Sequence, residues 1–207
     1  MKLAKTLVFA AALAPLGVLV WRVLTGRTSA NPAEDIILTT GIWALRFLLA
    51  TLTITPIRRL TGWNRIIRFR RMIGLFAFFY ASLHLASYIA FDRFFVFSEI
   101  LTDVAKRPFI TAGMVAFVLM IPLAITSTTG WIRRLGRRWQ VLHRLVYISA
   151  LAAVVHFLWK VKVAVGEPVY YAAVLAVLLA FRVLWRLKDT GRLKWITWLP
   201  PQSTPQP

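Results

Sequence analysis

The stretch WQVLHRLVYISALAAVVHFLWK, residues 139–160, decides the fold. It is apolar almost throughout, and as a helix it is long enough to cross the roughly 30 Å hydrocarbon core of a bilayer. His143 and His156 lie near its two ends. Ionisable side chains are costly inside a membrane and usually serve a function there, and imidazole is the commonest metal ligand. The stretch therefore predicts a membrane helix that carries two candidate ligands.

The rest of the chain has the composition of a membrane protein. Of its 207 residues 59% are hydrophobic, and its mean hydropathy is +0.68. We predict an all-α integral membrane protein, a six-helix transmembrane bundle forming one domain over residues 1–199, with a disordered proline-rich tail at 200–207. The first apolar segment resembles a signal peptide, but its length favours a retained span. The expected spans are about 7–24, 36–55, 72–91, 109–127, 141–159 and 169–187.

The net charge of +19 is arranged by loop. The 56–71 and 128–140 loops carry arginines and no acid, whereas acids balance the bases in the 25–35 and 92–108 loops. Because positive charge collects on the cytoplasmic side, we predict that both termini are cytoplasmic. A nucleic-acid-binding role is disfavoured, since no soluble basic face exists to carry it.

Other residue types narrow the chemistry. The chain has no cysteine, which excludes disulfides, cysteine-ligated iron–sulfur clusters and thiol catalysis. No nucleophile or acid–base constellation is visible. We expect Pro56 to end the second span and Pro122 to kink the fourth. We find no internal repeat.

Helix rise separates the three histidines by depth. His84 lies 13 residues beyond Arg71, or roughly 20 Å, and His156 lies 18 beyond Arg138, or about 27 Å. His143 is only about 7–8 Å beyond Arg138. Two axial ligands of one haem must lie at nearly the same level, so we predict that His84 and His156 form the pair.

His143 then marks a second position near the cytoplasmic surface. It could ligate a second haem, or lie beside a flavin or quinone as a hydrogen-bond partner or proton carrier. Histidines that merely bond between helices are the alternative, but three histidines confined to two spans of the same direction favour a cofactor. Zinc is disfavoured, because its tetrahedral sites need four close ligands.

Basic side chains are the remaining candidates. Arg46, inside the second span, could pair with a haem propionate or extend toward the interface. The arginine clusters that include Arg71 and Arg138 could hold a flavin phosphate, although a role in topology and contact with anionic lipid is favoured.

Three long motifs resemble one family. They are RFRRMIGLFAFFYASLHLASY, KRPFITAGMVAF and LAITSTTGWIRRLGRRWQVLHRLVYISALAAVVHFLWKVK, supported by LRFLLATLTITPIRR and NPAEDI. Over about residues 31–187 the chain resembles the MsrQ (formerly YedZ) family, the haem-binding membrane subunits of bacterial periplasmic methionine sulfoxide reductase systems. That family belongs to the wider ferric reductase and NADPH oxidase membrane-domain group.

The resemblance implies a six-helix protein of the bacterial inner membrane with b-type haem on His84, His143 and His156, associated with FMN. Electrons would come from the quinone pool or a cytosolic flavin reductase and pass to a periplasmic molybdopterin subunit, where sulfoxide reduction occurs. The wider group places two histidines on each of two helices, whereas the third span here has one. We therefore expect one outer haem on a complete pair of ligands, and an inner site that could hold a second haem, a flavin or a quinone.

Two other functions remain open at the level of sequence. One is a haem-bearing ferric or oxygen reductase that acts without a partner. The other is a proton-coupled transporter with Arg46 and the histidines as a relay. The absence of an acidic residue inside any span and of an inverted repeat speaks against the transporter.

Overall fold

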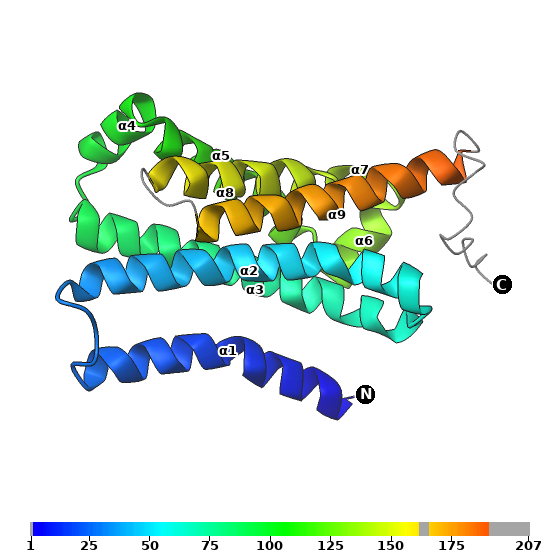
Figure 1. Ribbon diagram of the computed structural model, residues 1–207, viewed down its shortest axis with the longest axis horizontal. Helices are drawn as coiled ribbons and strands as arrows, with labels where there is room; N and C mark the ends of the chain where they lie inside the picture. Colours follow the sequence, from blue (N-terminus) through cyan, green and yellow to red (C-terminus); the bar gives the residue numbers. More distant parts are fainter. Residues whose placement is uncertain (1, 162–165, 191–207) are drawn as a thin grey trace.

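A computed structural model describes residues 2–161 and 166–190, and this part of the chain is helical, with no strand. Figure 1 shows the helices running side by side along one axis. The helices are α1 (Lys2–Leu24), α2 (Pro32–Thr61), α3 (Ile67–Ser87), α4 (Phe97–Lys106), α5 (Pro108–Ile125), α6 (Thr129–Leu135), α7 (Arg137–Leu142), α8 (Leu145–Lys160) and α9 (Glu167–Asp189).

Six segments of the described chain are long and apolar enough to cross a membrane, which confirms the predicted all-α six-span architecture. Short turns extend α3 at both ends, and α7 and α8 together form the fifth span. The spans are Lys2–Leu24, Pro32–Thr61, Asn64–Asp92, Pro108–Ile125, Arg137–Lys160 and Glu167–Asp189.

The two ends of the bundle differ in charge. The start of α1, the α2–α3 turn, α6, α7 and the end of α9 all lie at the right of Figure 1. We call this the arginine-rich end, because the basic 56–71 and 128–140 loops belong to it. The α1–α2 loop and α4 lie at the opposite end. Which end faces the cytoplasm remains a prediction, and the predicted tail at 200–207 lies outside the described residues.

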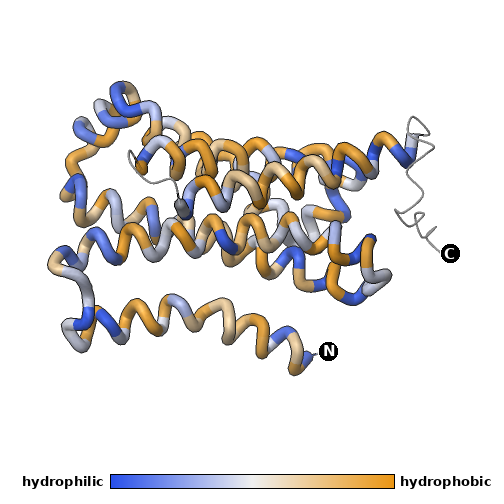
Figure 2. Tube along the Cα trace, in the orientation of Figure 1, coloured by the Kyte–Doolittle hydropathy of each residue, from blue (hydrophilic) through white to orange (hydrophobic). Residues whose placement is uncertain are grey.

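Residues of high hydropathy follow the spans along their length (Figure 2). The core runs between α2, α3, α5, α8 and α9. Its centre includes Leu52, Ala77 and Ala150, each with no exposed surface. Helix α1 packs on the outside through Ala12 against Phe76 and Tyr80. Within the membrane, packing and internal hydrogen bonds hold such helices together, because lipid is as apolar as the side chains.

Two helix pairs pack most closely, α2 with α3 and α5 with α8, and they repeat each other. His84 bonds to a carbonyl 47 residues earlier, and His156 does the same. In each pair a glycine 43 residues before the histidine packs against its ring: Gly41 and Gly113. A shift of 72 residues along the chain therefore relates the α2–α3 pair to the α5–α8 pair. This repeat corrects the sequence analysis, which found no internal repeat. The two helix pairs have few identical residues apart from the glycine and the histidine at each contact.

The prediction that Pro56 ends the second helix is wrong, because α2 continues to Thr61. A proline inside a helix leaves the carbonyl four residues earlier without its usual N–H donor. Here that carbonyl belongs to Leu52, and Nη2 of Arg182 donates to it at 3.2 Å. A cation from α9 thus replaces the missing helical bond and lets α2 continue through the proline.

The stretch around residues 139–160 is not one uninterrupted α-helix, as the sequence suggested. Helix α7 ends at Leu142 and α8 begins at Leu145. Between them the backbone hydrogen bonds span three residues instead of four. Arg144 N bonds to Val141 O at 3.1 Å, and Tyr147 N bonds to Arg144 O at 3.0 Å. Helix α5 runs through Pro122 to Ile125, and the kink expected at that residue stays a prediction.

Candidate functional site

His84 on α3 and His156 on α8 face each other inside the bundle. Their ring centroids are 6.0 Å apart, and the ring planes lie at 74°. The helix-rise calculation placed them at similar depth, and the structure brings them together. Both lie toward the end opposite the arginine-rich loops, since His84 is near the end of α3 and His156 is four residues from the end of α8.

Backbone carbonyls fix the tautomer of both rings. Nδ1 of His84 lies 2.9 Å from Ile37 O, and Nδ1 of His156 lies 2.6 Å from Phe109 O. A carbonyl oxygen only accepts, so Nδ1 carries the proton in each ring. Nε2 of each ring therefore keeps its lone pair, which is the form that binds a metal.

A glycine packs against each imidazole. A Cβ added at Gly41 would lie 2.9 Å from Nδ1 of His84, and one at Gly113 would lie 2.7 Å from Nδ1 of His156. Each glycine is one helical turn after the carbonyl that the ring binds. Only a residue without a side chain allows the ring to approach the helix this closely.

The distance between the two ring centroids is compatible with a metal ion bound between the imidazoles. Metal–nitrogen bonds of about 2.0–2.1 Å, plus roughly 1.1 Å from each nitrogen to its ring centre, give centroids about 6.2–6.4 Å apart. The observed 6.0 Å is close to that value. The described residues hold no group of three or more His, Cys, Asp and Glu that could bind a metal. A porphyrin supplies four ligands of its own, so the two histidines suit haem better than a protein-only metal centre.

His143 is held differently, in the turn between α7 and α8. Its ring stacks on Trp139, with centroids 3.9 Å apart. Nε2 lies 3.0 Å from Oγ1 of Thr126, and that hydroxyl donates its own proton to Pro122 O at 2.6 Å. The hydroxyl must therefore accept from Nε2–H, so His143 is in the opposite tautomer to the other two histidines.

The repeat assigns a counterpart to His143. A shift of 72 residues from His143 leads to Arg71, just as it leads from His156 to His84. Arg71 is exposed on the surface of α3, as is Arg138 on α7. The charge that acts on His143 comes instead from the half-buried Arg70.

The side chain of Arg46 makes its contacts with α9 and with its own helix. Its Nε donates to the hydroxyl of Tyr171 at 2.8 Å, and the guanidinium lies 4.9 Å from the ring centroid of Trp43. It also lines a cavity of about 500 Å³ between α1 and α2, together with Arg22. Arg46 is five residues from Gly41, about 140° around the helix. The guanidinium thus bonds to α9, and its pairing with a haem propionate stays a prediction.

Sequence reasoning missed Arg182, a second arginine inside a span. Its Nη1 donates to Tyr147 OH, and its guanidinium lies 4.7 Å from that ring. Its Nε is buried without a hydrogen bond to any described residue, and so is Oγ1 of Thr55. The signal was available, because an arginine interrupts LLAFRVLW as plainly as Arg46 interrupts its own span. The two glycines carried no such signal.

Comparison with known proteins places this geometry in context. The chain is 50% identical over 209 residues to the protein-methionine-sulfoxide reductase heme-binding subunit MsrQ of Xanthomonas oryzae pv. oryzae (strain MAFF 311018), covering 98% of this chain and 95% of the relative. It is 51% identical to the subunit of the same name from Xanthomonas euvesicatoria pv. vesicatoria (strain 85-10), with the same coverage. Identity reaches 53% over 186 residues with that from Herminiimonas arsenicoxydans, covering 88% of this chain and 85% of the relative.

A family model described as ferric reductase like transmembrane component matches residues 40–154. The matched range begins in α2 and ends in α8, two residues before His156. No solved structure matches the chain.

Proposed function

The chain belongs to the MsrQ family of heme-binding subunits within the ferric reductase-like membrane proteins, and from that premise we propose that it conducts electrons across the membrane through haem held by His84 and His156. The observation that carries the proposal is the facing pair itself, with centroids 6.0 Å apart and both Nδ1 atoms bonded to carbonyls. A bound haem of b type would supply one-electron chemistry at its iron.

The residues of the chain orient the ligands of that group. The carbonyls of Ile37 and Phe109 hold the two Nδ1–H groups, so that both Nε2 atoms are free to bind. Both rings are half-buried, on helices α3 and α8, which contribute to the apolar core of the bundle. Hydrogen bonds to the second nitrogen also raise the basicity of a ligating imidazole.

The direction of transfer follows from the charge of the loops. The arginine-rich end is assigned to the cytoplasm of a bacterial inner-membrane protein by the positive-inside rule. The haem on His84 and His156 then lies near the periplasmic side, where a methionine sulfoxide reductase partner would take up electrons. We assign sulfoxide reduction to that partner, a molybdopterin protein, and electron transfer to this chain.

Electrons enter at the other end, beside His143. This ring stacks on Trp139 and bonds to Thr126, and Arg70 adds positive charge. Because Nε2 of His143 is already a hydrogen-bond donor, this arrangement favours a flavin such as FMN or a quinone over a second haem with two axial histidines. The donor would be the quinone pool or a cytosolic flavin reductase.

Three single variants test the proposal. His84→Ala and His156→Ala should each abolish the b-type absorption bands of the purified protein and its pyridine haemochrome. His143→Ala should retain haem at the wild-type stoichiometry while slowing reduction by quinol or reduced flavin. Flavin quantitation on the same samples would show whether FMN is retained. Normal spectra in both outer variants, or loss of the haem in His143→Ala alone, would refute the assignment.

A further inference from the structure

The loop that follows α3 presents a strongly apolar surface. Six large side chains here are 42–75% exposed, more than their hydrophobicity allows in water. They lie between the end of the third span at Asp92 and the start of the fourth at Pro108, or on the flanking residues. We call this surface the phenylalanine face, and it comprises Phe91, Phe94, Phe95, Val96, Phe97 and Leu101.

The backbone is strained to form this face. Phe94 has φ 46° and Phe95 has φ 62°, in the left-handed region that bulky side chains avoid. The surrounding chain fixes both residues, since Phe95 N bonds to Ile89 O at 3.0 Å and Val96 N bonds to Arg93 O at 2.8 Å. Such conformations persist only where the structure imposes them, and they often mark functional positions.

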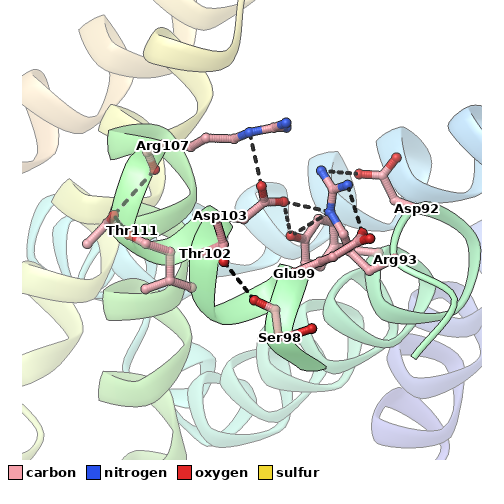
Figure 3. A network of polar contacts seen from close by, with 10 residues as sticks. Asp92, Arg93, Ser98, Glu99, Thr102, Asp103, Arg107 and Thr111 are labelled. Atoms are coloured by element: carbon pink, nitrogen blue, oxygen red, sulfur yellow. Dashed lines mark hydrogen bonds and ion pairs between the residues drawn. The ribbon is translucent and has the colours of Figure 1, made fainter. Parts of the chain in front are cut away.

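The charged side chains of the same segment pair with one another (Figure 3). Nε of Arg93 lies 2.6 Å from Asp103, and its Nη atoms lie 3.7 Å from both Asp92 and Glu99. Arg107 binds the other oxygen of Asp103 at 3.1 Å. The hydrogen bond to the hydroxyl of Tyr88 raises the pKa of Arg93 further above its ordinary value, so the guanidinium stays charged.

Helix α4 carries its exposed apolar and exposed polar residues in two separate stripes. Phe97 and Leu101, four residues apart, share one exposed stripe, whereas Ser98 and Thr102 form an exposed polar stripe beside it. Ile100 and Asp103 are buried against the bundle. An apolar stripe on a short helix that joins two spans is the arrangement of a helix lying in the membrane surface.

We propose that the phenylalanine face lies in the boundary between headgroups and acyl chains of the bilayer, at the end of the bundle opposite the arginine-rich loops. Charge favours lipid over a protein partner. The three acids between residues 92 and 107 are matched by Arg93, Lys106 and Arg107, so this segment has no net charge to steer a partner. Transient electron-transfer encounters bury small areas and depend on charge complementarity, which a surface of phenylalanines cannot offer.

This contact would set the depth of the histidine pair. Tyr88 follows His84 by one helical turn and donates to Asp103 at 2.7 Å. Arg107, which binds the same carboxylate, is two residues before Phe109, the residue whose carbonyl holds His156. Asp103 therefore ties α4 to the third span, which carries His84, and to the start of α5, where the carbonyl of Phe109 holds His156. The polar stripe of α4 is left facing water.

The chain has no cysteine, so single cysteines can be introduced without background and labelled with a nitroxide. Phe97→Cys and Leu101→Cys probe the apolar stripe, and Ser98→Cys and Thr102→Cys are matched controls on the same helix. The labelled full-length proteins are reconstituted in vesicles of phosphatidylethanolamine and phosphatidylglycerol. Power-saturation EPR then compares collisions with oxygen, which partitions into lipid, and with a water-soluble nickel chelate.

Labels at 97 and 101 should collide several-fold more with oxygen than with nickel, and labels at 98 and 102 should show the reverse. Equal nickel accessibility at all four positions would overturn the proposal. So would labels at 97 and 101 that are open to nickel in vesicles and become protected only when the sulfoxide reductase partner is added, since the face would then dock protein. The haem spectrum of each sample separates this result from a failure of the proposed electron-transfer function.

Discussion

Gly113 and His156 are in such close contact that a Cβ on the glycine would lie 2.7 Å from Nδ1 of the imidazole. Gly41 and His84 repeat this relationship at 2.9 Å. The absence of a side chain at each glycine therefore allows each imidazole to occupy its position between its carbonyl partner and the facing histidine.

Replacing either glycine should disturb the site without touching a ligand. Gly113→Ala or Gly41→Ala forces the ring away from its carbonyl, and overpacking of this kind costs about 1–3 kcal/mol. We expect haem retention to fall by about an order of magnitude, together with a shift in the low-spin EPR signal. Gly17→Ala on α1 is the control, because no described atom lies within 4 Å of a Cβ there. Unchanged haem content and EPR in both variants would show that the rings tolerate displacement.

Arg182 and Pro56 should be energetically coupled. Arg182→Met removes the donor that satisfies Leu52 O and leaves that carbonyl buried, at a cost of about 1–3 kcal/mol. Pro56→Ala restores a backbone N–H that can bond to the same carbonyl. Thermal unfolding followed by circular dichroism should therefore show that Arg182→Met lowers the melting temperature less in the Pro56→Ala background than in the wild-type background. Additive effects of the two changes would refute the coupling.

Tyr80 holds α1 against the bundle through one inserted hydroxyl. Its OH donates to Ala12 O at 2.9 Å and accepts from Leu16 N at 3.1 Å, beside Pro15. Tyr80→Phe should destabilise the α1 contact by about 1–2 kcal/mol, since it leaves buried backbone groups unpaired. Faster proteolysis of the α1–α2 loop would report this, and the exposed Tyr170→Phe should leave the rate unchanged.

Asp103 and Glu99 both pair with Arg93, but in different surroundings. The side chain of Asp103 is 9% exposed and accepts from Tyr88, Arg93 and Arg107, whereas that of Glu99 is 57% exposed. Asp103→Asn should cost about 1.5–3 kcal/mol, because a buried charge-assisted bond is lost. Glu99→Gln should change stability by less than about 1 kcal/mol. Comparable melting temperatures for the two variants would mean that burial does not decide the strength of this network.

Much of the fold was accessible from composition alone. The six spans are local runs of apolar residues, and each run is dictated by the thickness of the bilayer. The similar depth of His84 and His156 followed from helix rise, which is a local property of the chain. The family resemblance on the long motifs was confirmed by relatives about 50% identical over nearly the whole length.

Features that depend on neighbouring helices could not be read from the sequence. The continuation of α2 past Pro56 depends on Arg182, which lies 126 residues away along the chain. The opposite tautomers of His143 and His156 depend on whether a ring meets the hydroxyl of Thr126 or the carbonyl of Phe109.

The sequence by itself determined that this chain crosses a membrane six times and which histidines share a level, because bilayer thickness and helix rise act on each segment separately. Only the tertiary structure decided which ring nitrogen is free, which glycines admit the rings and which arginine replaces a helical bond. Those features arise where two helices approach within hydrogen-bond distance, and no local pattern of residues encodes that approach.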